Sequence, residues 1–137
     1  MADRIRRFVS PKVAEYPPGH WSNCLRVGDH IWLSGFTARD ADLKTIGGTG
    51  SAYEQAKIIF TKVENCLAEA GASMRDVVNM TIYLTDIADN REVWRARQEF
   101  FTGDFPCSTL VEVSALADPD ILVEITCQAM AGSGHDR

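Results

Sequence analysis

The stretch L-R-V-G-D-H-I-W-L-S-G-F, residues 25–36, consists of two short apolar runs with Gly28-Asp29 between them. Glycine supplies the backbone freedom that a tight reversal requires, so this stretch predicts a β-hairpin. Residues 39–50, which follow it, are polar and rich in glycine and predict a loop. The G-G-x-G at residues 47–50 is weak evidence for phosphate binding, because it lacks the spacing of the known phosphate-binding loops and no strand leads directly into it.

Two amphipathic helices are predicted further along the chain. Ser51-Ala-Tyr-Glu54 has the form of a capping box, which marks the start of a helix. Behind it, apolar residues recur at three- and four-residue spacing until Gly71 ends the pattern: Ala56, Phe60, Val63, Leu67 and Ala70. A second, shorter helix extends from Val93 to Phe100 and is ended by the turn at residues 103–106.

The remaining apolar segments predict strands. Residues 77–86, V-V-N-M-T-I-Y-L-T-D, place Val78, Met80, Ile82 and Leu84 on one face and polar residues on the other. Residues 109–115 and 121–129 are also strand-like and are joined by a turn at 118–120. The predicted order is β-β-α-β-α-β-β, an α+β domain with two helices on one face of a mixed sheet. Because the other face would retain many aliphatic positions, we expect the chain to form an oligomer.

Length and composition favour a single intracellular domain. The chain has 137 residues, enough for one hydrophobic core, and we assign residues 1–131 to the domain and residues 132–137 to a flexible tail. With 14 Lys and Arg against 19 Asp and Glu, the net charge is −5, which argues against nucleic acid as a partner. No apolar run is long enough to span a membrane and no secretory signal is recognisable, so we expect a cytoplasmic protein.

The cysteines and histidines form no metal-binding pattern. The four cysteines are widely spaced without a C-x-x-C, and the three histidines include no paired ligand motif. We therefore expect reduced thiols, no metal and no cofactor. Cysteines in a cytosolic chain of this size are usually small buried residues.

Three blocks of sequence resemble the RidA (YjgF, L-PSP endoribonuclease-like) family, in the order that the family has them. They are the hairpin at residues 25–35, the block A-G-A-S-M-R-D-V-V-N-M-T-I-Y-L-T-D-I-A-D at 70–89, and F-F-T-G-D-F-P at 100–106 with L-V-E-V-S-A-L and L-V-E-I behind it. The resemblance implies a chorismate-mutase-like α+β fold that assembles into a homotrimer. It also implies clefts between subunits, where the best-known members hydrolyse reactive enamines and imines.

The chain departs from the family at the residue that holds the substrate. Members with deaminase activity carry an arginine in a P-A-R-[ST] pattern, and its planar guanidinium binds the substrate carboxylate through two hydrogen bonds. The matching residues here are Pro106-Cys107-Ser108-Thr109, so Ser108 stands where the arginine is expected. Losing charge-assisted hydrogen bonds worth ~1.5–3 kcal/mol each makes efficient deamination of 2-aminoacrylate doubtful.

Other site residues follow from the same resemblance. Glu124 in L-V-E-I matches the glutamate that positions or activates the attacking water, and Ser34-Gly35 matches backbone at the border of the cleft. Trp21 and Trp94 replace a tyrosine and an asparagine of the family and would enlarge an apolar wall. Two alternatives remain open: Trp94 as a core residue of its helix, and Glu124 as a salt-bridged residue on an outward strand face.

Two further alternatives concern the missing arginine. Cys107 is either a small buried residue or a nucleophile, if a neighbour activates its thiol. Arg39, Arg95 and Arg97 are either solvated or supply a replacement cation, in which case the substrate is a longer acid.

These residues lead to two main functional hypotheses. The first is a hydrolytic deaminase acting on an enamine- or imine-like small metabolite other than 2-aminoacrylate, with Glu124 as the catalytic residue and with Trp21, Ser34, Gly35, Trp94, Cys107 and Ser108 binding the substrate. The second is a non-catalytic trimer that binds a small metabolite in its clefts. An endoribonuclease is a remote third, because an acidic chain does not offer a cationic groove.

Overall fold

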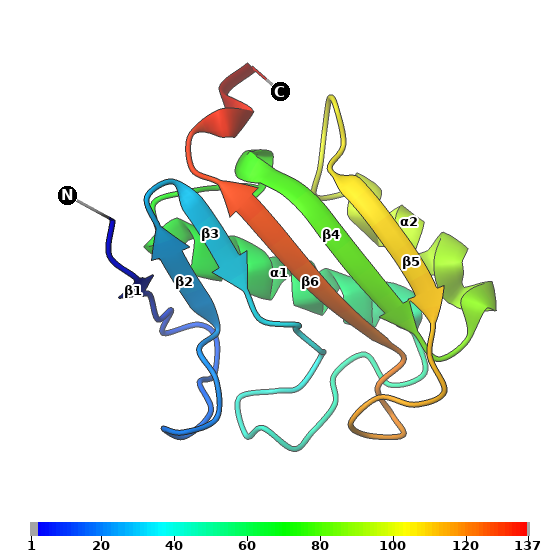
Figure 1. Cartoon of the computed structure of the whole chain (residues 1–137). Helices are drawn as coiled ribbons and strands as arrows, with labels where there is room; N and C mark the ends of the chain where they lie inside the picture. Colours follow the sequence, from blue (N-terminus) through cyan, green and yellow to red (C-terminus); the bar gives the residue numbers. More distant parts are fainter. Residues whose placement is uncertain (1–2, 137) are drawn as a thin grey trace.

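Two helices cover one face of a six-stranded sheet in the computed structural model of the chain, which describes residues 3–136 (Figure 1). The strands are β1 (Arg6–Arg7), β2 (Cys24–Val27), β3 (His30–Leu33), β4 (Val77–Leu84), β5 (Cys107–Glu112) and β6 (Val123–Met130). The α-helices are α1 (Ala52–Glu69) and α2 (Asn90–Gln98), and the short 3-10 turns are η1 (Met74–Asp76), η2 (Ile87–Asp89) and η3 (Ser133–Asp136). The predicted α+β class and element order are confirmed, with the short strand β1 added at the N-terminal side.

The β2–β3 hairpin and helix α1 have the ends that the sequence predicts. Val27 pairs with His30 across the turn, and Gly28 takes a positive φ of 58° there. The Ser51 hydroxyl accepts a hydrogen bond from the Glu54 N–H at 3.1 Å, which caps the first turn of α1. Gly71, with a φ of 81°, follows its last residues. The apolar stripe of α1 is buried against the sheet.

Strand β4 corrects one detail of the predicted alternation. Met80, Ile82 and Leu84 are fully buried beneath the helices, as expected, but the fourth buried residue is Val77 and not Val78. The register against β6 shifts between Val77 and Asn79, so the chain bulges there. A bulge adds one residue to a strand and thereby reverses the alternation beyond it.

Helix α2 and strand β5 begin and end earlier than predicted. Helix α2 starts at Asn90, directly after the turn η2, and ends at Gln98, because the next N–H groups bond to carbonyls only three residues back. Strand β5 starts at Cys107, directly behind Pro106, and runs parallel to β4 as far as Glu112. Since α2 connects β4 to β5, the two strands form a β-α-β unit.

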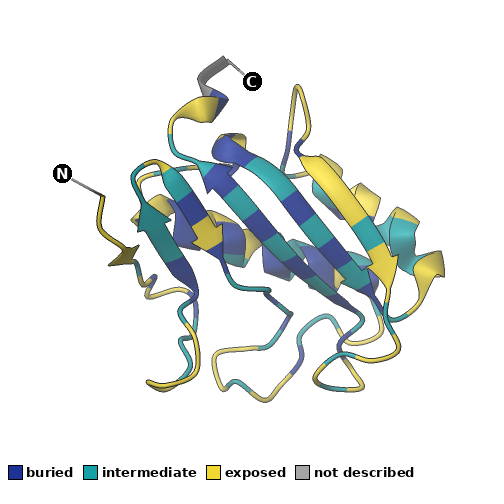
Figure 2. Ribbon diagram, viewed as in Figure 1, coloured by how far each residue is buried: buried dark blue, intermediate teal, exposed yellow. Residues whose placement is uncertain are grey.

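Strand β6 occupies the middle of the sheet. The strand order is β1-β2-β3-β6-β4-β5, so the last strand lies between the hairpin and β4 and is antiparallel to both. Figure 2 shows buried and half-buried residues alternating along β4 and β6, whereas β5 at the edge is mostly exposed. The core therefore lies between the central strands and α1.

The buried amide of Gln55 joins α1 to the segment that leads into β6. Its Nε2 donates to the Asp120 carbonyl and its Oε1 accepts from the Leu122 N–H, both at 2.9 Å. The side chain has no exposed surface. These bonds replace the hydrogen bonds to a neighbouring strand that the backbone lacks just before β6 begins.

The face of the sheet opposite the helices is more polar than the sequence indicated. Because the aliphatic residues of β4 and β6 point to the helices, the open face receives Asn79, Thr81, Tyr83, Glu124 and Thr126. Apolar side chains on it are fewer, with Trp32 at 40% and Val111 at 40% exposure. No helix among the described residues is long and apolar enough to cross a membrane.

The end of the chain contains a short ordered contact. Ser133–Asp136 form the turn η3, where flexibility was expected, and the Gly134 N–H donates to the Asp76 carboxylate at 2.8 Å. Gly134 is buried against the Arg75 backbone, where a Cβ would overlap it. The flexibility of residues 132–137 in solution stays a prediction.

Replacing Gln55 by leucine should destabilise the domain by about 2–4 kcal/mol, because a partly buried N–H and a partly buried carbonyl would lose their partners. Urea unfolding measures this change. Gln98→Leu, on the exposed end of α2, is the matched control and should change the free energy of unfolding by less than about 0.5 kcal/mol. Equal stability of Gln55→Leu and wild type would show that the amide bridge contributes nothing.

Candidate active site

The Glu124 carboxylate lies against a glycine on the open face. Strand β6 directs Glu124 to this face, and the backbones of Phe36 and Ile125 exchange hydrogen bonds of 2.9 and 3.1 Å. This pairing holds Gly35 beside Glu124. A Cβ on Gly35 would overlap the Glu124 carboxylate and lie 3.1 Å from the Thr126 hydroxyl. Glycine at position 35 is therefore what leaves room for the carboxylate.

A loop that carries two aromatic residues lines the other side of a small hollow in front of Glu124. The hollow has a volume of about 120 Å³, and its lining includes Tyr16, Trp21, Gly35, Arg39 and Glu124. The Trp21 ring is 45% exposed and its centre lies 4.1 Å from that of Tyr16. Trp21 is thus part of the wall of this hollow, and its role in binding a substrate stays a prediction.

Two polar residues hold this loop in place. The Ser34 hydroxyl donates to the Ser22 carbonyl at 2.6 Å, and the Asn23 amide donates to the Ala14 carbonyl at 3.0 Å. Ser34 does not line the hollow itself: its hydroxyl fixes the loop, and the hydroxyl proton is not directed toward a ligand.

Partial burial changes the proton affinity of two groups around the hollow. Burial raises the pKa of Glu124 above the usual value of a glutamate, because the carboxylate is poorly solvated there. Burial lowers the pKa of Lys62 to about 8. The Lys62 ammonium donates to the carbonyls of Thr37 and Arg39 at 2.7 and 2.6 Å. A carboxylate with a raised pKa beside an accessible hollow has the properties of a general base.

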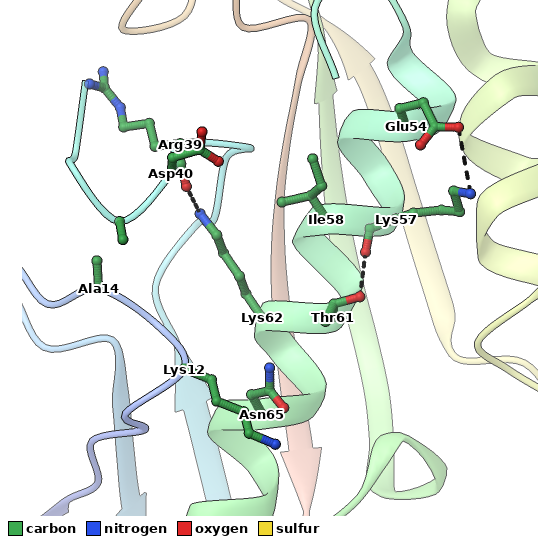
Figure 3. A pocket seen from close by; sticks show the side chains of 11 residues that line it. Lys12, Ala14, Arg39, Asp40, Glu54, Lys57, Ile58, Thr61, Lys62 and Asn65 are labelled. Atoms are coloured by element: carbon green, nitrogen blue, oxygen red, sulfur yellow. Dashed lines mark hydrogen bonds and ion pairs between the residues drawn. The ribbon is translucent and has the colours of Figure 1, made fainter. Parts of the chain in front are cut away.

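A second, larger hollow lies on the other side of Lys62, between α1 and the loop of residues 37–46. It has a volume of about 330 Å³ and shares Ala14, Arg39 and Lys62 with the first. Figure 3 shows its cations on α1, on the loop and, at Lys12, on the N-terminal segment, with Lys62 directed at the loop backbone. Lys57 is 3.6 Å from Glu54, so its charge is compensated locally. The hollow is not a continuous cationic groove.

Ser108, the residue at the family's arginine position, does not lie on the same face of the sheet as Glu124. Ser108 is level with Met80 and Cys127 in the sheet, and both of these are buried on the helix side. Ser108 therefore points to the helix side of the sheet, whereas Glu124, level with Tyr83, points to the open face. One protomer cannot bring Ser108 and Glu124 to the same small ligand.

Helix α2 supplies one neighbour of Ser108. The Arg97 Nη1 donates to the Ser108 hydroxyl at 3.0 Å. Trp94 is one turn earlier on α2 and 43% exposed, so it is not a core residue of its helix. The predicted residues thus form two groups: Trp21, Gly35 and Glu124 at the hollow, and Trp94 and Ser108 together with Arg97 at the α2–β5 edge.

Cys107 belongs to neither group. It is exposed on β5, level with Asn79 on the open face, so the expectation of a small buried residue is wrong for this cysteine. Pro106 at the edge of the sheet leaves the start of β5 uncovered. Cys24, Cys66 and Cys127 are free and buried, as expected. No group of three or more His, Cys, Asp or Glu that could hold a metal ion occurs in the part of the chain that the structure describes.

Sequence reasoning did not identify Tyr16 and Lys62 as parts of the site. Tyr16 lies just before the Pro17-Pro18-Gly19 turn that precedes Trp21, and a second aromatic residue in this loop was an available signal. Lys62 gave no signal, because a lysine on an amphipathic helix is usually solvated. Only the position of the loop over α1 buries its ammonium.

Known proteins resemble this chain over nearly its whole length. The family model described as Endoribonuclease L-PSP matches residues 12–131. A RutC family protein of Pyrococcus abyssi is 35% identical over 120 residues, which cover 88% of this chain and 93% of that protein. A human protein named 2-iminobutanoate/2-iminopropanoate deaminase is 30% identical over 132 residues, 96% of this chain and 95% of that one.

A solved structure shows the same fold. The crystal structure of a protein of unknown function from Pseudomonas aeruginosa superposes with a TM-score of 0.86 at 39% identity, over 95% of this chain and 94% of that chain. The protein is thus an α+β domain with a half-buried carboxylate at the open face of its sheet. It belongs to the endoribonuclease L-PSP family, which includes the RidA and YjgF proteins.

The raised pKa of Glu124 predicts that Glu124→Gln is more stable than wild type at neutral pH. The ionised carboxylate is disfavoured in the folded state, so the stabilisation by the protonated form is lost as pH rises through the folded pKa. The glutamine variant should be more stable than wild type above the usual glutamate pKa of 4.5 and equally stable below it. Thermal unfolding between pH 4 and pH 8 measures it. A less stable variant at pH 7 would contradict the burial argument.

Proposed function

We propose that this protein hydrolyses the C=N bond of an imine, or of the enamine that tautomerises to it, and releases ammonia. The observation that carries the proposal is the half-buried Glu124 carboxylate, which lies against the bare backbone of Gly35 and opens onto a hollow. The deaminase name of the human relative supports the same reaction class.

Glu124 acts as the general base in this reaction. It takes a proton from a water molecule while the water oxygen bonds to the carbon of the protonated imine, which gives a neutral carbinolamine. The protonated Glu124 then returns this proton to the nitrogen. As the C–N bond breaks and ammonia leaves, the carbinolamine hydroxyl gives its proton to the Glu124 carboxylate, and a carbonyl compound is released. A raised pKa suits both steps, because the group must accept a proton and then give it back.

The complete site requires a second copy of the chain. A hollow of about 120 Å³ is smaller than the roughly 300 Å³ typical of small-molecule sites. Glu124 and Ser108 lie on opposite faces of the sheet of one protomer. A cleft formed by the open face of one subunit and the α2–β5 edge of the next would unite the two groups, and a closed three-fold ring repeats this contact without leaving an edge. The exposed strand β5 favours such a contact.

The substrate differs from 2-aminoacrylate. Ser108 provides no charge for a small carboxylate, and Trp21 and Trp94 offer exposed rings that suit a larger, partly apolar body. The alternative, a trimer that binds such a metabolite without reaction, predicts binding but no ammonia. An endoribonuclease is not favoured, because Lys57 of the larger hollow is paired with Glu54 and the chain carries a net charge of −5.

Glu124→Gln should lower the rate of ammonia release by about 10²–10⁴-fold, the range expected for the loss of a general base. The measurement compares ammonia release from an aromatic imine generated in the assay. Glu64→Gln, on the exposed face of α1, should retain the wild-type rate. If wild type binds the imine and releases no ammonia above the uncatalysed rate, the non-catalytic alternative replaces this proposal.

Wild type should be almost inactive on 2-aminoacrylate, and Ser108→Arg should raise kcat/KM for it by at least about tenfold, because a guanidinium at this position pairs with a small carboxylate. Thr109→Arg is the matched control, since Thr109 points to the other face of β5. High wild-type activity on 2-aminoacrylate would show that another residue already holds the short carboxylate.

A further inference from the structure

Arg97 is a partly buried cation next to the position of the missing arginine. It lies in the last turn of α2, and its Nη1 donates to the Ser108 hydroxyl at 3.0 Å. The guanidinium therefore reaches from the helix to the start of β5. Of Arg39, Arg95 and Arg97, only Arg97 is hydrogen-bonded to position 108 in the described structure.

The guanidinium of Arg97 is not electrically compensated. Its Nε is fully buried and has no hydrogen-bond partner, and none of the ion pairs between described residues includes it. Burial lowers its pKa. Its neighbour Arg95 differs in each respect, since it pairs with Glu92 at 2.7 Å and lies over the Tyr53 ring. A partly buried charge without a counter-ion is costly, and an anion bound beside it would offset that cost.

The surroundings of Arg97 suit an acid with an apolar portion. Trp94 precedes Arg97 by three residues, so both lie on the same side of α2. Ser108 adds a hydroxyl that can donate to the same anion, since its oxygen accepts from Arg97 and its proton remains free. A planar guanidinium and a hydroxyl together form a suitable pair of donors for a carboxylate.

We propose that Arg97, with Ser108, binds the carboxylate of the substrate in place of an arginine at position 108. This inference rests on the proposed function for its reaction but not for its binding site. The Arg97 guanidinium lies next to the strand, whereas an arginine at 108 would extend away from it by the length of its own side chain. The bound carboxylate therefore lies closer to the strand than one held by an arginine at position 108 would. The substrate is accordingly an imino acid whose carboxylate is separated from the C=N carbon by additional methylene groups.

Binding of glutarate, a dicarboxylate of suitable length, tests the site independently of turnover. Calorimetry on the intact oligomer should give a Kd that is about 10- to 100-fold weaker for Arg97→Met than for wild type, the range expected for losing a charge-assisted pair. Arg95→Met is the control and should bind as wild type does, because Arg95 is exposed and already paired. No binding to wild type, or equal binding to Arg97→Met, would overturn the proposal.

A conservative variant covers the case in which Arg97→Met does not fold. Arg97→Lys keeps the charge and loses the planar pair of donors, so it should bind glutarate with intermediate affinity and remain folded in thermal unfolding. Wild-type affinity in this variant would contradict recognition by a guanidinium.

Turnover then separates this inference from the proposed function. Wild type should hydrolyse 2-iminoglutarate at least tenfold faster than 2-iminopropanoate; Arg97→Met should lose this preference, whereas Arg95→Met should keep it. If no imine is hydrolysed but glutarate binding depends on Arg97, the reaction is wrong and the carboxylate site stands. If the neutral imine is hydrolysed and glutarate binding is independent of Arg97, the reaction stands and the site is wrong.

Discussion

Insertion of β6 between β3 and β4 is the constraint on which the rest of the structure depends. The last strand must pair with a hairpin formed about a hundred residues earlier and with β4 on its other side. This double pairing buries alternate residues of β6 beneath α1 and directs the others to the open face. The Gln55 amide holds the segment that enters β6, so an interaction on the helix side fixes the register on the face that carries Glu124.

The same arrangement divides the candidate site. Glu124 is fixed beside Gly35 in the middle of the sheet, whereas Ser108 and Arg97 are fixed at its edge by the β4–α2–β5 unit. Neither group is large enough to enclose a metabolite. Partner subunits would complete both at once, which gives a physical reason for an oligomer that is independent of the hydrophobicity of the open face.

Three ionisable groups around these regions are partly buried, and the cost of burying the charge is offset differently in each. Lys62 is stabilised by two backbone carbonyls. Glu124 has a raised pKa, which a general base requires. Arg97 has a hydroxyl and an unpaired Nε, which leaves room for an anion. Groups with perturbed proton affinity gather at functional sites, and these three lie where the cleft is proposed.

The sequence by itself determined the hairpin at Gly28, the helix after Ser51, the α+β class and the family, because these depend on local turn chemistry, capping and periodicity. It also singled out Glu124, Gly35 and Ser108 as positions in a motif. Only the tertiary structure decided which faces these residues occupy: the bulge between Val77 and Asn79 reversed one alternation, and α2 ended early enough to place Arg97 over Ser108. Burial and pairing between segments far apart in the chain decide such contacts, and no local pattern encodes them.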